Sequence, residues 1–216
     1  MVAPALAVLA VVAAYPIVFA IYLSSRRKIL VFREDEGIGL ENYRFLFEDG
    51  RFWSALGNTA YFTLVAVTLE LCLGVAFALL LHRAVPGQRL LRASVLVPWA
   101  IPSVVSAKLW AWLFDAQHGL VTRALGAALP LGDADILGTP VWAMHAAIAV
   151  DVWKTTPFIA LLALAGLKSI PDDVYRAAAI DGASAARLVF RIELPMLRST
   201  LVVAALLRAL DAFRVF

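Results

Sequence analysis

Charged residues and cysteine are both scarce in this chain. Only 16% of its 216 residues are charged, whereas a soluble domain carries about 25%. Hydrophobic residues make up 62% of the chain, and the mean hydropathy is +0.85. This composition excludes an ordinary soluble domain and predicts an all-α, polytopic membrane protein. The single cysteine, Cys72, excludes both a disulfide within the chain and a metal site built on thiolates. Because Cys72 lies in an apolar run, we expect it to be a small packing residue in the core.

Motifs for catalysis and nucleotide binding are also missing from the sequence. It contains no Gly-x-x-x-x-Gly-Lys-Ser/Thr loop to bind ATP phosphates, no His-Glu-x-x-His and no Gly-x-Ser-x-Gly. The three histidines, His82, His118 and His145, are far apart in the chain. We therefore predict no catalytic residue, no metal site and no cofactor in this chain. The net charge of +3 does not indicate nucleic-acid binding, because the basic residues gather at the ends of apolar runs.

Long apolar runs dominate what is present. A helix that crosses a bilayer needs about 20 apolar residues, and five runs meet this need: 2–23, 59–81, 93–114, 141–167 and 196–216. The first run is too long for a signal peptide and lacks a basic start, so we expect an uncleaved span. The basic residues of the connecting loops are nearly balanced between the two sides, so they do not orient the spans.

Two polar segments connect these runs. Residues 24–57 carry a basic run, an acidic run and then many aromatic residues. Aromatic rings beside a span are typical of a helix at the membrane interface, so we predict an interfacial helix in this segment. Residues 115–139 are rich in glycine and proline, and we predict a loop there.

Ionisable residues inside the predicted spans are informative, since a charge within a membrane needs a partner or a function. Glu70 lies near the middle of the second span, and Asp151 and Lys154 can pair on one helix face. A polar solute that crosses the membrane needs hydrogen-bonding side chains, and aromatic faces can pack against its apolar surface. On these grounds the candidates for a substrate path are Asp151, Trp153, Lys154, Arg208, Asp211 and Phe213.

Two other roles remain open for these ionisable residues. They could pair with one another, or with a partner subunit, as packing contacts. Alternatively, Glu70, Asp151 and Asp211 could relay protons or ions in a transporter that works alone.

Residues 171–195 are the longest polar-flanked segment between two apolar runs, and their pattern predicts two short helices. Pro171 suits the first turn of a helix, and Gly182 can end that helix in the left-handed conformation. Pro195 restricts the residue before it and is expected to end the second helix. The first helix has one mostly small face: Val174, Ala177, Ala178 and Asp181. Such a face favours docking into a cleft of another protein, although a surface loop packed on its own domain has the same pattern.

The stretch Arg176-Ala177-Ala178-Ala179-Ile180-Asp181-Gly182-Ala183, followed by Phe190, Ile192, Leu194 and Pro195, resembles the EAA loop of permease subunits in binding-protein-dependent ABC importers. In that family the loop is cytoplasmic, and its first helix couples the permease to an ATPase subunit. The resemblance implies coupling residues at Tyr175, Arg176, Ala177, Ala178, Asp181, Gly182, Ala183, Leu194 and Pro195. Arg176 stands where the family usually has glutamate, which reverses a charge at the expected ATPase contact.

Residues 24–59 and 113–120 are similar to the carbohydrate branch of the same family, which takes up sugars, oligosaccharides or glycerol phosphates. The resemblance implies a type I permease-like helical bundle in the bacterial inner membrane, with residues 24–57 on the outer side and a sixth span missing beyond residue 216.

The partners that the resemblance implies are a second homologous permease, two ATPase subunits that bind ATP and Mg²⁺, an extracytoplasmic solute-binding protein and membrane lipid. The implied function is ATP-driven uptake of a sugar, coupled through residues 171–195. The alternative is the stand-alone secondary transporter with intramembrane carboxylates. An intramembrane enzyme would need a nucleophile–base pair, and the spans contain no convincing one.

Overall fold

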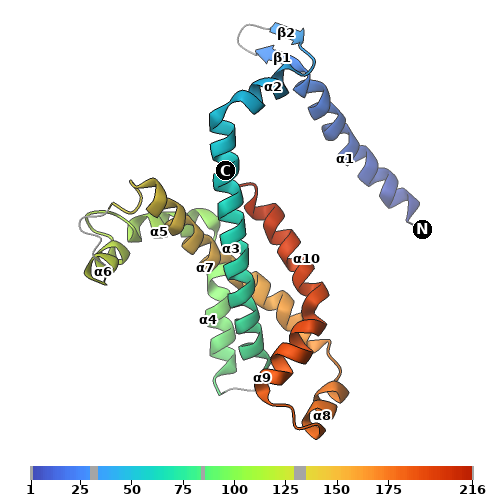
Figure 1. Cartoon of the computed structure of the whole chain (residues 1–216), viewed down its shortest axis with the longest axis vertical. Coiled ribbons are helices and arrows are strands. Elements are labelled where there is room, and N and C mark those ends of the chain that lie inside the picture. The colour runs from blue at the N-terminus through green and yellow to red at the C-terminus, as the bar shows by residue number, and fades with distance from the viewer. Residues whose placement is uncertain (1, 30–33, 84–85, 129–134, 216) are drawn as a thin grey trace. The chain divides into compact units, whose positions relative to one another are not determined.

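The computed structural model describes residues 2–29, 34–83, 86–128 and 135–215. The chain divides into two compact units, Met1–Asn58 and Thr59–Phe216, and each is described by itself. The second unit is a bundle of helices, which confirms the predicted all-α class (Figure 1).

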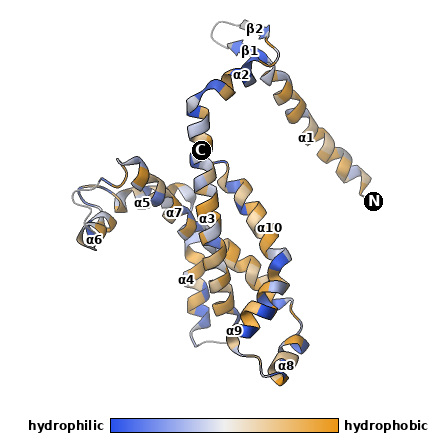
Figure 2. Ribbon diagram, viewed as in Figure 1, coloured by the Kyte–Doolittle hydropathy of each residue, from blue (hydrophilic) through white to orange (hydrophobic). Residues whose placement is uncertain are grey.

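The first unit contains helix α1 (Ala3–Ser24), strands β1 (Arg26–Ile29) and β2 (Glu34–Gly37), helix α2 (Glu41–Glu48) and the start of α3 (Gly50–His82). Figure 2 shows α1 as hydrophobic along most of its length and the strands as mainly hydrophilic. The aromatic residues Tyr43, Phe45 and Phe47 of α2 are exposed, and the position of α2 at a membrane interface stays a prediction.

Sequence analysis does not predict the antiparallel strand pair of β1 and β2. Its register sets the basic run against the acidic run, with Arg27 opposite Glu36 and Lys28 opposite Asp35. Opposite charges across an antiparallel pair stabilise it, and Arg26 also forms an ion pair with Asp35. The segment predicted to contain an interfacial helix therefore also contains an antiparallel strand pair, because its two charged runs attract each other.

The second unit continues α3 and adds helices α4 (Gln88–Ala100), α5 (Ser103–Leu113), α6 (Leu120–Ala128), α7 (Pro140–Lys168), α8 (Asp172–Ile180), α9 (Ala185–Leu188) and α10 (Leu194–Ala212). A π-helical turn, η1 (Val189–Glu193), joins α9 to α10. Helix α6 lies within the segment predicted as a loop, and residues 129–134 of that segment lie outside the described residues. Cys72 is exposed, so its predicted place in the core is wrong.

All five predicted spans coincide with helices, but they differ in their capacity to cross a membrane. Among the described residues, α1, α3 and α7 are each long and apolar enough to do so. Helices α4 and α5 would form a fourth span together, although they meet at 95°. Helix α10 does not qualify, because it carries charged residues that include Arg198, Arg208 and Asp211.

Close approach of α3, α7 and α10 builds the core. One cluster of buried side chains joins α3, α7 and α10: Ala78, Leu81, Ala163, Leu164, Leu167, Ile170 and Leu197. Glycines permit the approach, since a Cβ atom on Gly74 would lie 2.5 Å from Ile159 Cγ2. A Cβ atom on Gly166 would lie 2.6 Å from Leu197 Cδ2. Small residues at such contacts are typical of membrane helix packing.

We expect Gly74→Ala to destabilise the bundle, because its methyl group would collide with Ile159. Overpacking of this kind costs roughly 1–3 kcal/mol. The matched control is Gly57→Ala, also within α3, where a Cβ atom meets nothing within 4 Å. Thermal unfolding of the detergent-solubilised protein should give a lower midpoint for Gly74→Ala and an unchanged or higher midpoint for Gly57→Ala. Equal midpoints would contradict the close α3–α7 contact.

Candidate functional site

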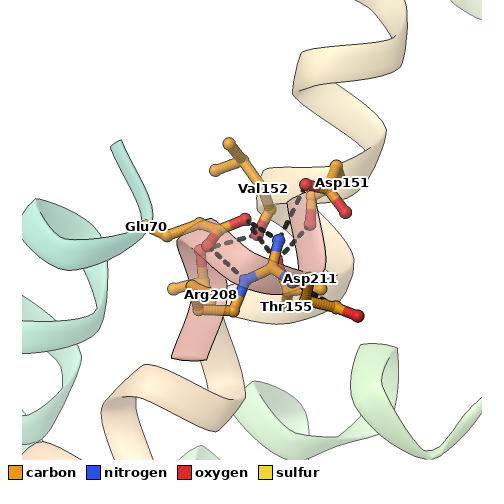
Figure 3. A network of polar contacts seen from close by, with 7 residues as sticks. Glu70, Asp151, Val152, Thr155, Arg208 and Asp211 are labelled. Atoms are coloured by element: carbon orange, nitrogen blue, oxygen red, sulfur yellow. Dashed lines mark hydrogen bonds and ion pairs between the residues drawn. The ribbon is translucent and has the colours of Figure 1, made fainter. Parts of the chain in front are cut away.

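A network of charged side chains joins α3, α7 and α10 in the interior of the second unit (Figure 3). Arg208 of α10 donates from Nε to Oε2 of Glu70 at 2.7 Å and from Nη2 to Oε1 of the same carboxylate at 2.9 Å. Nη2 also contacts Asp151 of α7 at 2.9 Å, and Nη1 contacts Asp211 at 2.6 Å. We call these four residues the Arg208 cluster.

Burial makes the Arg208 cluster energetically important. The side chain of Glu70 is 0% exposed and that of Arg208 is 4% exposed, whereas that of Asp211 is 68% exposed. A two-pronged guanidinium–carboxylate pair has the geometry that compensates best for the removal of two charges from water. The Thr155 hydroxyl lies within hydrogen-bonding distance of Glu70 Oε1 and of the Asp151 carbonyl, and it can donate to only one of them at a time.

The predicted pair between Asp151 and Lys154 is wrong. Asp151 binds Arg208, and the Lys154 ammonium instead donates to the backbone carbonyl of Ile101 at 2.6 Å. Helical spacing permits an i,i+3 pair, but it does not account for a partner on another helix. Glu70, which sequence analysis left outside the substrate path, occupies the centre of the network. Its only signal in the sequence was a carboxylate in an apolar run.

Two cavities are lined in part by residues of this network. The first has a volume of about 320 Å³, and its lining includes Asp151, Lys154 and the aromatic rings of Phe62, Trp110 and Phe114. The second has a volume of about 350 Å³, and its lining includes Trp99, Arg208 and Asp211. A cavity with aromatic walls and few polar groups is typical of a small-molecule site.

The structure therefore separates the six residues predicted for a substrate path. Asp151 and Lys154 line the first cavity, while Arg208 and Asp211 line the second. Trp153 packs edge-on against Trp110 with ring centroids 5.3 Å apart. Phe213 is half exposed. In the described part of the chain, no group of three or more His, Cys, Asp or Glu residues is placed to hold a metal ion.

The predicted coupling segment has its own local geometry. Helix α8 begins after Pro171, with Asp172 and Asp173 in its first turn, and it ends at Ile180. Gly182 adopts φ +65°, as predicted. The N–H groups of Gly182 and Ala183 then donate to the carbonyls of Ala179 and Ala178, at 3.2 and 2.9 Å. This is the hydrogen-bond pattern by which a left-handed glycine ends a helix.

The small face of α8 is divided between the inside and the outside of the unit. Ala178 is buried, and Val174 and Tyr175 pack against the core cluster that contains Leu81 and Leu197. Burial, followed by the nearby carboxylate of Glu193, raises the pKa of the Tyr175 phenol. Arg176, Ala177, Asp181 and Ile180 are exposed, and Ile180 is 86% exposed. Val174 and Tyr175 thus hold α8 to its own bundle, and the exposed residues form its outer face.

Pro195 does not end the second helix, which corrects the prediction from the sequence. The backbone continues from α9 through η1 into α10, and Leu194 is in the right-handed helical region at φ −61° and ψ −45°. Proline lacks an N–H group and crowds the carbonyl four residues before it. The wider π-helical turn before Pro195, in which Leu194 N–H donates to the Val189 carbonyl, accompanies this defect in a continuous helix.

The sequence is similar to a known protein family and to several individual proteins. Residues 70–214 match the family described as "Binding-protein-dependent transport system inner membrane component". The trehalose/maltose transport system permease protein MalF of Thermococcus litoralis is 41% identical over the whole chain, which covers 73% of that protein. The trehalose transport system permease protein SugA of Mycobacterium tuberculosis is 42% identical, with 100% of this chain and 69% of that protein covered.

A third relative and a solved structure are also similar to this chain. The sulfoquinovosyl glycerol transport system permease protein SmoG of Agrobacterium fabrum is 37% identical, with 99% of this chain and 70% of that protein covered. A crystal structure of a bacterial ABC transporter that imports the polysaccharide alginate superposes with a TM-score of 0.80 at 23% identity. The superposition covers 98% of this chain and 71% of that one, and it establishes a shared fold.

We expect Arg208→Met to destabilise the protein strongly, because it leaves the buried Glu70 carboxylate unpaired. Loss of one partner from a buried ion pair costs about 3–5 kcal/mol. The matched control is Arg214→Met, which removes an exposed arginine just beyond the end of α10. Thermal unfolding midpoints of the purified variants provide the measurement. A normal midpoint for Arg208→Met would show that the Arg208 cluster does not hold the three helices together.

Proposed function

The chain belongs to the family of inner membrane components of binding-protein-dependent transport systems, and from this premise we propose that it is the membrane-spanning permease subunit of an ATP-driven sugar importer. Family membership confirms the predicted permease-type membrane protein, its location in the inner membrane and the absence of enzymatic activity of its own. The observation that carries the proposal is the 41–42% identity to two sugar permeases over the whole chain.

A sugar is the solute class that the first cavity supports. The names of the three relatives refer to trehalose, maltose and sulfoquinovosyl glycerol, which are all rich in hydroxyl groups. The Asp151 carboxylate can accept hydrogen bonds from hydroxyl groups, and the Lys154 ammonium can donate to their oxygen atoms. The rings of Trp110 and Phe114 offer apolar faces to the C–H surface of a sugar.

Coupling to ATP hydrolysis is assigned to α8. Its outer face presents Arg176, Ala177 and the strongly exposed Ile180, while Val174 and Tyr175 pack its inner face against the bundle. A helix that is exposed on one side and packed on the other can pass a displacement to the helices beneath it. The proposed contact is an ATPase subunit that binds ATP and Mg²⁺, with two such subunits in the complex.

The remaining partners follow from the family of transport systems to which the chain belongs. We assign a second, homologous permease subunit, an extracytoplasmic solute-binding protein and the surrounding lipid as partners. The family description refers to binding-protein-dependent transport, and one solved neighbour is an alginate transporter in complex with an alginate pentasaccharide-bound periplasmic protein. A stand-alone secondary transporter is disfavoured, because the three relatives described above are named as transport-system permeases.

The charge at Arg176 distinguishes this chain from its family's usual pattern. Arg176 forms an i,i+3 ion pair with Asp173 on the exposed side of α8. Both side chains are largely exposed, so the pair contributes little to stability. Its proposed role is to present a compensated charge to the ATPase where the family usually has a glutamate.

We expect Asp151→Asn to reduce solute transport by removing a carboxylate acceptor from the first cavity. Hydrogen bonds to charged groups contribute roughly 1.5–3 kcal/mol, which corresponds to a loss of about tenfold or more in rate if the bond forms at the transport barrier. The measurement is uptake of labelled trehalose by proteoliposomes that hold the complete complex, with its binding protein and ATP. Asp211→Asn, in the second cavity, is the comparison. A loss of uptake in Asp211→Asn alone would assign the solute path to the second cavity. Normal uptake in both variants would show that neither residue belongs to the solute path.

The coupling role of α8 is tested at Gly182, whose φ of +65° disfavours side chains. No atom lies within 4 Å of an added Cβ, so backbone conformation alone decides the outcome. Gly182→Val should abolish most ATP-driven uptake, because a β-branched residue resists this conformation. Gly182→Asn should retain it, since asparagine tolerates the left-handed region. Both proteins should reach the membrane in normal amounts, as measured by quantitative blotting. Normal uptake with Gly182→Val would count against coupling through α8.

A further inference from the structure

The break between α4 and α5 needs more than proline to explain its geometry. The two helices meet at 95°, and only Ile101 and Pro102 separate them. Both connecting residues are extended, with ψ angles of 133° and 139°. Pro102 restricts Ile101 to an extended conformation, which interrupts the helix. It does not determine the direction in which α5 leaves, because an interrupted helix can turn to several sides.

A charged side chain from another helix binds the backbone at this break. Lys154 of α7 donates from Nζ to the Ile101 carbonyl at 2.6 Å. The two residues are 53 positions apart, and their bond is partly buried. An ammonium donor makes a stronger hydrogen bond than a neutral one. The carbonyl of a broken helix therefore receives a strong partner, which fixes the break relative to α7.

The same lysine faces the first cavity. Lys154 lines it together with Asp151 one helical turn earlier, and α5 supplies another part of the wall through Ala107, Trp110 and Ala111. Trp110 also packs edge-on against Trp153, the neighbour of Lys154. Helix α5 is thus connected to α7 by a hydrogen bond at its N-terminal break and by a ring contact about two turns further on. A third contact lies at the other end of α5, where Phe114 packs in a buried cluster with Ala146 of α7.

We propose that Lys154 is a positioning residue that holds the α4–α5 break through the Ile101 carbonyl and thereby sets the α5 wall of the first cavity. This role concerns the shape of the cavity and holds for any solute. An ammonium group has three N–H donors, and Ile101 takes one of them. Lys154 can therefore fix the cavity wall and also face its contents.

The test is a cross-link across the first cavity in the assembled transporter. Cysteines replace Ala111 of α5 and Ala147 of α7, which both line the cavity and are exposed, in a Cys72→Ser background. A short bismaleimide is added to membranes, and the rate of intramolecular cross-linking is followed. Three further variants are compared: Lys154→Met, Lys154→Arg and, as matched control, Lys108→Met. Lys108 is an exposed lysine of α5 away from the break.

Removal of the ammonium should lower the cross-linking rate by about tenfold in Lys154→Met, because loss of a charge-assisted hydrogen bond releases the wall. Lys154→Arg should keep most of the rate, since guanidinium can donate to the same carbonyl, and Lys108→Met should match the parent. The thermal unfolding midpoint of the complex separates this local effect from general damage. If Lys154→Met does not reach the membrane, Lys154→Leu replaces it as the uncharged variant without an N–H donor. A parental rate in the uncharged variant would overturn the proposal, and so would an equal loss in Lys154→Arg and Lys154→Met.

Discussion

The pairing of Arg208 with Glu70 is the interaction on which the rest of the second unit depends. It connects residues 138 positions apart, and both side chains are buried. Two charges removed from water are tolerated only when they meet in good geometry, so α3 and α10 are restricted to one register. Asp151 adds α7 to the same guanidinium. The polar residues that line the two cavities are members of this network or its direct neighbours. Charge pairing and the proposed solute path therefore occupy one region.

The packed core gives this region a physical link to α8. Val174 and Tyr175 of α8 contact the cluster of Leu81, Leu167 and Leu197, which belong to α3, α7 and α10. These are the same three helices that the Arg208 cluster joins. A displacement of α8 would therefore act on all three together, because a close-packed interior transmits strain. The continuous helix through η1 into α10 adds a covalent route from the coupling segment to Arg208.

Local features of the chain could be predicted from the sequence, and features that depend on distant partners could not. Apolar runs located the main helices, and Gly182 located the end of α8, because both depend on nearby residues. The strand pair escaped prediction because it depends on a register between two charged runs, and the partner of Asp151 escaped because Arg208 is 57 positions away. The 95° angle between α4 and α5 could not be predicted, because Pro102 interrupts a helix without setting the direction in which the next one leaves. Resemblance predicted the coupling segment, and the structure separated the buried Ala178 from the exposed Ile180.

The central claim, that the outer face of α8 meets an ATPase subunit, is tested most directly by cross-linking in native membranes. Single cysteines are placed at Ile180, which is exposed, and at Ala178, which is buried, in a Cys72→Ser background. A short bifunctional thiol reagent is added, and the adducts are identified by mass spectrometry. The account predicts a specific adduct with an ATP-binding subunit from position 180 and little or none from position 178. Labelling of position 180 only from outside the cell, or no ATPase adduct from it in an actively transporting complex, would contradict the account.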